Sequence, residues 1–235
     1  MSLKSLLFGR QKLPESSALS AFYSGDIAKW NDIYRGGGEW RYVRKGGMNG
    51  GTRKIASLGA AKAVCAELSR LCFTEGTELV CSDKETENYL KAVFNDNGFP
   101  ERFSDFLEKM FALGGGVIKV CWDGAPKLDF VSADAFVPTK WDGRGIFGGA
   151  FGSIASKNGK SFFLAETQEI TPQGLLTQNR LFRDNGSEVP LSECFPDLTE
   201  KSALEGLSKP LFVYFRAASG TLPQCPPLGA SVFAG

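Results

Sequence analysis

The stretch 114-GGGVIKVCWDGAPKLDFV-131 decides the fold of this chain. Just before it, apolar side chains recur at helical spacing over residues 103–111. The three consecutive glycines stop that helix, and the residues after them follow the shorter period of strands. Asp123-Gly124 then separates two strand-like runs, which is a strong hairpin signal. We therefore expect the chain to change from helix to antiparallel strand at these glycines.

More strand-like runs follow, and turn pairs such as Asn158-Gly159 separate them. The expected strands are 117–122, 127–131, 145–154, 160–168, 174–182 and 210–215. One short helix is expected near residues 199–207. Because the turns between the runs are short, we expect consecutive strands to pair as an antiparallel meander.

Helices are expected ahead of the three glycines. Residues 55–72 carry apolar side chains at three- and four-residue steps, which predicts an amphipathic helix. After a short strand at 77–81, Ser82 and Glu85 have the spacing of a capping box, which would open a second helix with Tyr89 facing inward. The sequence thus predicts an α+β fold, with N-terminal amphipathic helices followed by an antiparallel β-meander.

Composition limits the chemistry that is available. The chain has 235 residues, a formal net charge of +1 and no histidine. Without histidine, Ser-His-Asp and Cys-His nucleophile systems and histidine-based zinc sites are excluded. The six cysteines lie far apart and form no C-x-x-C pair, so we interpret them as buried free thiols in a reducing compartment. No apolar window is long enough for a membrane helix, so the sequence indicates a cytosolic protein without a membrane partner.

Neither the glycine-rich stretches nor the acid pairs indicate a site. The stretch 44-RKGGMNGGTRK-54 lacks the G-K-[ST] of a phosphate-binding loop, and 114-GGGVIKV-120 precedes a strand where a dinucleotide-binding fingerprint would follow one. Acid pairs such as Asp83 with Glu85 fit the opening turn of a helix, where negative charge is favourable. We predict no catalytic residue, no cofactor and no metal.

One segment concentrates positive charge. Between positions 41 and 54 the chain has five basic residues and no acid, with Trp40 and Tyr42 interleaved. The basic residues are Arg41, Arg44, Lys45, Arg53 and Lys54. They are candidates for contact with nucleic-acid phosphates or with an acidic surface of a neighbouring subunit. The alternative is a solvated glycine-rich loop whose aromatic side chains dock on the domain.

The sequence closes on an apolar run, 226-PPLGASVFAG-235. The last residues of a domain are usually poorly ordered unless something holds them. We expect this run to need a partner surface that the chain itself lacks, and we therefore interpret the chain as cut short.

Several segments, taken in order, resemble the N-terminal portion of portal proteins of tailed phages, of the type found in long-tailed phages of Gram-positive hosts. They are Trp30-x-x-Ile33-Tyr34-x-Gly36 with Trp40 following, 53-RKIASLGAAKAVCAELSRLCFTEG-76, 97-NGFPERFSDFLEKMFALGGGVIKVCWD-123, 130-FVSADAFVPT-139 as a strand, the hairpin 145–168, VPL at 189–191, and KPLFVYFR followed by the C-terminal run. The resemblance covers most of residues 25–235.

This resemblance implies a structural subunit of a ring of about a dozen copies at one vertex of the capsid. Its implied partners are further copies of itself, the capsid, the terminase motor, neck or adaptor proteins, and double-stranded DNA in the channel. The implied location is the virion, with assembly in the host cytoplasm. The implied parts are an N-terminal arm with the basic loop (1–54), a helical part of the wing (55–123), a β-rich part of the wing (124–216), and the start of a missing region that precedes the stem and clip (217–235).

Two other functions remain open at this point. One is a nucleic-acid or protein-binding module built on the basic segment 41–54, and alanine replacement of its basic residues would test it. The other is a small enzyme that uses carboxylate or thiol chemistry, which a pocket with two convergent acids or with a thiolate beside a cation would favour.

Overall fold

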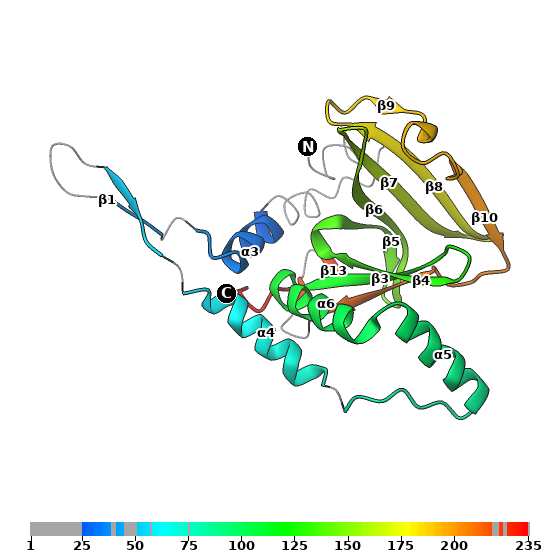
Figure 1. The fold of residues 1–235 in the computed structure, drawn as a ribbon, viewed down its shortest axis with the longest axis horizontal. Helices are drawn as coiled ribbons and strands as arrows, with labels where there is room; N and C mark the ends of the chain where they lie inside the picture. The colour runs from blue at the N-terminus through cyan, green and yellow to red at the C-terminus, as the bar shows by residue number, and fades with distance from the viewer. Residues whose placement is uncertain are drawn as a thin grey trace.

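The structure is a computed structural model, and it describes residues 25–38, 41–44, 51–56, 58–74, 76–217, 221–222 and 225–234. In this part of the chain it confirms the α+β class, because helices are followed by a long series of antiparallel strands (Figure 1). The helices are α3 (Ile27–Tyr34), α4 (Ala60–Cys72), α5 (Lys84–Asp96) and α6 (Phe99–Leu113).

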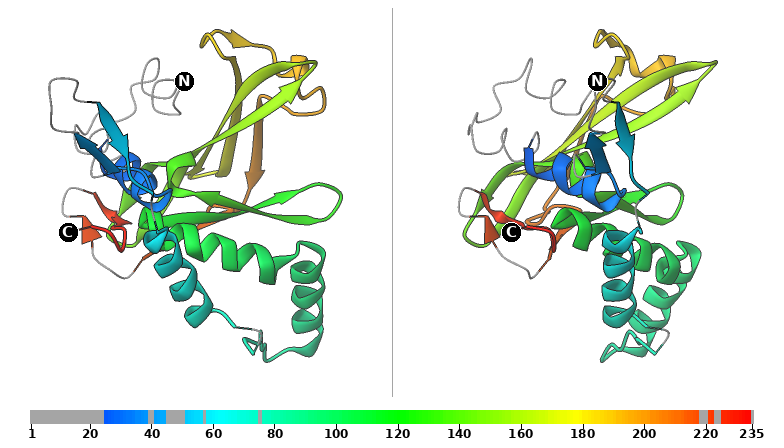
Figure 2. Two further views of the ribbon diagram at one scale, coloured as in Figure 1. Left: turned by 60° about the vertical axis from the view of Figure 1, so that its left-hand side comes forward. Right: turned by 90° about the vertical axis from the view of Figure 1, so that its left-hand side faces the viewer.

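Two antiparallel sheets contain most of the strands. The three-stranded sheet has the order β11-β3-β4, and the six-stranded sheet has the order β10-β8-β7-β6-β5 with β9 paired to β8. Figure 2 shows the long strands of the second sheet rising away from the β3–β4 hairpin, so that the two sheets diverge. The strands are β3 (Gly115–Trp122), β4 (Pro126–Ser132), β5 (Phe136–Asp142), β6 (Gly145–Lys157), β7 (Lys160–Thr171), β8 (Gly174–Arg183), β9 (Glu188–Val189), β10 (Lys201–Glu205) and β11 (Phe212–Arg216).

Two small ribbons complete the described strands. One pairs β1 (Tyr42–Arg44) with β2 (Thr52–Lys54), and the other pairs β12 (Thr221–Leu222) with β13 (Cys225–Gly229). The β1–β2 ribbon projects from the body of the molecule next to α3 (Figure 1).

Helix α6 lies at the centre of the packing. Its buried residues Phe106, Leu107 and Met110 recur at helical spacing, as the sequence predicts. Phe106 meets Phe215 of β11 edge to face, with ring centroids 5.5 Å apart, which joins the helix to the three-stranded sheet. Gly114 ends the helix with a φ of 83°, a left-handed conformation that favours glycine. The predicted change from helix to strand at these glycines is confirmed.

The C-terminal apolar run packs inside the fold, so the expectation that it lacks a partner surface is wrong. The Ser231 hydroxyl donates a hydrogen bond to the Ala112 carbonyl over 2.6 Å, and the Val232 amide donates to the Phe111 carbonyl over 3.1 Å. Residues 228–233 join α3 and the end of α6 in one apolar cluster. The run is held by the domain that precedes it in the sequence.

Two glycines allow this close docking. A Cβ atom at Gly114 would overlap the backbone of Gly229, and a Cβ atom at Gly229 would overlap the carbonyl oxygen of Gly114. The two backbones therefore touch at a point where neither residue could carry a side chain without movement.

Three local predictions are wrong. Residues 77–81 form no strand, because they pair with no other strand in the described part of the chain. Asp83, one residue beyond Ser82, caps α5, and its carboxylate accepts a hydrogen bond from the Thr86 amide over 2.7 Å. The segment 199–207 contains strand β10 and no helix, because pairing with β8 outweighs its weak helical pattern.

Other predictions are wrong in detail. The segment 130–139 is divided into β4 and β5 by a short 3₁₀ helix at Ala133–Ala135. Tyr89 is exposed on α5, because only α6 packs against that helix to a notable extent. Among the thiols, Cys65 is buried but Cys72 is exposed, so the cysteines are not uniformly core residues.

Candidate assembly and binding surfaces

The basic segment forms the projecting β1–β2 ribbon. The register pairs Tyr42 with Lys54, Val43 with Arg53, and Arg44 with Thr52, while Lys45 lies outside the described residues. Arg53 and Lys54 are both exposed, and because they are successive residues of one strand, their side chains leave opposite faces of the ribbon. The ribbon therefore presents positive charge on both faces and does not gather it into one patch.

Arg41 has a structural role at the base of the ribbon. Its guanidinium donates to the Ile55 carbonyl over 3.1 Å and also to the Gly36 carbonyl. These bonds tie together the two chain segments that enter and leave the ribbon. Tyr42 is exposed, so the alternative in which it docks on the domain is wrong for this residue, whereas Trp40 lies outside the described residues.

Helix α4 leaves one apolar side uncovered. We define the α4 flank as Leu58, Val64 and Leu71, whose side chains are exposed by 99%, 51% and 66%. Val64 and Leu71 are seven residues apart and so lie on the same side of the helix. The predicted amphipathic helix is present from residue 60 onward, but a large part of its apolar face meets solvent.

The opposite side of α4 is firmly packed on α6. Cys65 and Ser69 are its buried residues, and the Ser69 hydroxyl donates to the Ser104 carbonyl over 2.7 Å. Burial raises the pKa of the Cys65 thiol to about 11, so this thiol is neutral at physiological pH. The helix is thus fixed on one side, which keeps the α4 flank turned outward.

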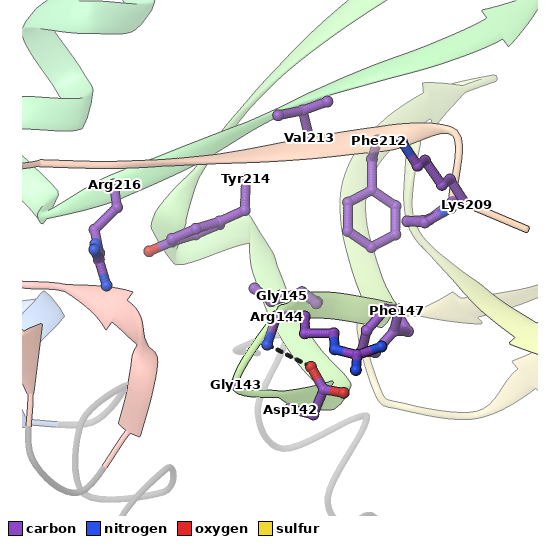
Figure 3. Close-up of a pocket in the computed structure, with 12 residues that line it drawn as sticks. Asp142, Gly143, Arg144, Gly145, Phe147, Lys209, Phe212, Val213, Tyr214 and Arg216 are labelled. Carbon is purple, nitrogen blue, oxygen red and sulfur yellow. Dashed lines mark hydrogen bonds between the residues drawn. The ribbon is translucent and has the colours of Figure 1, made fainter.

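A groove of about 670 Å³ lies between β11 and the turn that joins β5 to β6 (Figure 3). Phe212 and Tyr214 point into it from β11, and Phe147 points into it from β6. Three cationic residues, Arg144, Lys209 and Arg216, are also among its lining residues. The groove therefore combines aromatic walls with positive charge.

A buried ion pair joins the two sheets close to this groove. Lys119 of β3 is 8% exposed, and its Nζ lies 2.7 Å from Glu166 Oε2 of β7 and 3.6 Å from Asp129 Oδ2 of β4. Burial acts to lower the pKa of Lys119, but attraction by the two carboxylates outweighs it, so the pKa is raised and the ammonium stays charged. Lys119 faces Phe212 across the β3–β11 pairing, which places the ion pair beside the groove wall.

The amide of Gln168 extends this polar centre. Its Nε2 donates to Glu166 Oε1 over 2.7 Å, while its Oε1 is buried and has no hydrogen-bond partner. The arrangement holds the Glu166 carboxylate from two sides and fixes its position between the sheets. It contains one lysine held by two carboxylates, so it acts as a structural link between the sheets.

Within the described residues, no group of three or more Cys, Asp or Glu side chains is placed to hold a metal ion. A search of the same residues finds no helix that is both long enough and apolar enough to span a lipid bilayer.

No protein-family model matches the sequence, and a search of curated proteins also finds no match.

Sequence reasoning missed the groove, because its residues come from distant parts of the chain. Arg144 stands in an ordinary Asp-Gly-Arg-Gly turn, and Lys209 stands before a strand. Neither position carries a motif, and only the approach of β11 to the β5–β6 turn brings them to one place.

Proposed function

We propose that this chain is the wing portion of a portal subunit of a tailed phage, with a structural role in a ring at the capsid vertex. The order of its elements, helices and then an antiparallel meander, is the order that the resemblance implies. In this proposal its partners are further copies of itself, the capsid, the terminase, neck or adaptor proteins and the packaged DNA, and its location is the virion.

The single observation that carries the proposal is the α4 flank. A helix that is packed on one side and apolar on its other side leaves surface that a neighbouring protein can bury. In a ring, each subunit meets the next by a head-to-tail contact, so one flank of every copy is covered by a different surface of its neighbour. The projecting β1–β2 ribbon offers a second surface with which a neighbour could make contact.

The proposal is tested by the assembly state of the complete subunit. We expect a sedimentation coefficient of a ring, and a ring in negative-stain images, for the protein that contains this chain. Val64→Asp with Leu71→Asp should reduce the ring fraction strongly, because a buried charge opposes association. Ile154→Asp is the control, because Ile154 is 81% exposed on β6, a strand that Figure 1 shows in a different part of the molecule from α4. A complete subunit that stays monomeric where capsids assemble would refute the proposal.

A second candidate function is supported by the exposed charges of the ribbon. Arg53 and Lys54 could contact phosphates, as in a nucleic-acid-binding module. Binding of this kind should weaken steeply with salt, and Arg53→Ala with Lys54→Ala should reduce its salt dependence. If the double variant binds duplex DNA as the unchanged chain does, the ribbon has no such role.

A further inference from the structure

Strand β11 is paired on one side only within the part of the chain that the structure describes. The sheet order is β11-β3-β4, so β3 is its one strand neighbour. The Val120 amide donates to the Leu211 carbonyl, and the Ala217 amide donates to the Gly114 carbonyl. In an antiparallel pair these bonds recur at every second residue, so residues 211, 213, 215 and 217 face β3.

The residues between them face the other way. The backbone N–H and C=O groups of Phe212 and Tyr214 are directed at the open edge, and they have no backbone partner among the described residues. An open strand edge is a template for one more strand. Figure 3 shows the side chains of the same two residues on the groove side of β11.

The groove therefore lies beside the open edge and along the same strand. An added strand would place every second side chain on the face that Phe212 and Tyr214 share. Burial raises the pKa of Tyr214 to about 12, so its hydroxyl stays neutral and its ring forms an uncharged wall. Phe147 supplies apolar surface from the opposite side.

The charges at the groove favour an acidic ligand. Arg144 and Lys209 are exposed, and neither forms an ion pair within the described residues. Asp142 is the one carboxylate among the lining residues, and its Oδ1 accepts a hydrogen bond from the Arg144 amide over 2.6 Å. Arg144 and Lys209 thus place two exposed cationic side chains at the groove, while its single carboxylate is already engaged by the turn.

We propose that β11 and this groove bind an extended acidic peptide segment of a partner protein, which adds to the sheet as a further strand. Main-chain hydrogen bonds to Phe212 and Tyr214 would give affinity, and carboxylates beside Arg144 and Lys209 would give direction and specificity. A single nucleic-acid strand could use the cations and the aromatic rings but not the open strand edge, so a peptide uses more of the observed features. The proposal is independent of the portal assignment, because no residue of the groove belongs to the α4 flank or the ribbon.

The test uses the full 235-residue chain and a short fluorescein-labelled peptide in which glutamate alternates with valine. Fluorescence anisotropy should show saturable binding of this peptide. A lysine-valine peptide of the same length should bind at least about tenfold more weakly, because its charges are repelled. A glutamate-valine peptide with methylated backbone amides should also bind at least about tenfold more weakly, because it cannot pair with a strand.

Charge reversals locate the site. Arg144→Glu with Lys209→Glu should weaken binding of the glutamate-valine peptide at least about tenfold. Lys160→Glu is the matched control, because it makes the same kind of charge change at the exposed β6–β7 turn, and it should leave binding unchanged. Circular dichroism of each variant would check that it is folded. In the unchanged chain, peptide binding should slow hydrogen exchange at the Phe212 and Tyr214 amides.

Three outcomes would overturn the proposal. The first is that the glutamate-valine peptide does not bind. The second is that its binding survives the double charge reversal, and the third is that hydrogen exchange slows at other amides but not on β11. If a thymidine oligonucleotide binds where the peptide does not, and Arg144→Glu with Lys209→Glu abolishes that binding, the groove is a nucleic-acid site and the peptide proposal is wrong.

Discussion

Replacing Lys119 by methionine should destabilise the chain, because it removes one member of the buried ion pair between the sheets. Methionine keeps the length of the side chain but leaves the Glu166 carboxylate without its 2.7 Å partner. Loss of one partner of a fully buried pair costs roughly 3–5 kcal/mol. Because the Glu166 side chain is 18% exposed, and water can reach part of it, we expect about 2–3 kcal/mol of the free energy of unfolding to be lost.

A second substitution separates the loss of the pair from a loss of packing. Lys119→Met with Glu166→Gln removes both charges, and the new amide can still accept the hydrogen bond that Gln168 donates. We therefore expect the double variant to be more stable than Lys119→Met alone, by about 1 kcal/mol or more. In thermal unfolding of a chain of this size, Lys119→Met should lower the Tm by about 5–10 °C.

The exposed pair between Lys140 and Glu169 is the control. Their side chains are about half exposed and the Nζ–Oε1 distance is 3.1 Å, so Lys140→Met should change the free energy of unfolding by less than about 0.5 kcal/mol. Urea unfolding followed by tryptophan fluorescence measures all three variants. The reasoning is refuted if the double variant is no more stable than Lys119→Met alone, or if Lys119→Met loses no more stability than Lys140→Met.

Three further predictions concern the close packing of the tail, a buried carboxylate and the thiols. Gly229→Ala should lower stability by about 2 kcal/mol or more, because the added Cβ overlaps the facing carbonyl oxygen, and limited proteolysis should then cut the C-terminal run faster. Hydrogen bonding, led by the bond from Lys91, lowers the pKa of Glu87 from its ordinary value of 4.5 to about 2. The ionised carboxylate therefore stabilises the fold above pH 4.5, and this stabilisation is lost as the pH falls from 4.5 toward 2. In Glu87→Gln the free energy of unfolding should therefore fall less between pH 4.5 and pH 2 than in the unchanged chain. The same pH dependence in both chains would contradict this prediction. Cys72 should react with iodoacetamide much faster than Cys65 in the folded chain, because Cys65 is buried and its thiol pKa is raised. Peptide mass mapping of the alkylated chain measures the two rates.

Local patterns predicted the elements that local interactions determine. The stripe on α6, its end at Gly114 and the hairpins at Asp-Gly and Asn-Gly turns are each encoded within a few residues, and each is confirmed. The segment 201–205 has no strong pattern of its own, and its strand conformation depends on pairing with β8. This is why the sequence favoured a helix there.

The candidate sites were harder to predict than the elements. Lys119 and Glu166 lie 47 positions apart, and nothing in the sequence near either residue indicates the other. The ribbon was predicted as a basic segment, but the alternation of Arg53 and Lys54 across its two faces follows only from the strand pairing. The C-terminal run was predicted to be unpartnered, because its contacts with α6 are made across more than a hundred residues of chain.

The contact between Gly114 and Gly229 has a consequence for finding relatives of this chain. Two positions whose main chains press against each other cannot vary one at a time, since any side chain at one collides with the other. Homologues that keep the docked tail should therefore show glycine at both sites together, and homologues that lose one should lose the other or rearrange the tail. Paired glycines about 115 residues apart could therefore identify distant homologues whose overall sequence identity to this chain is low.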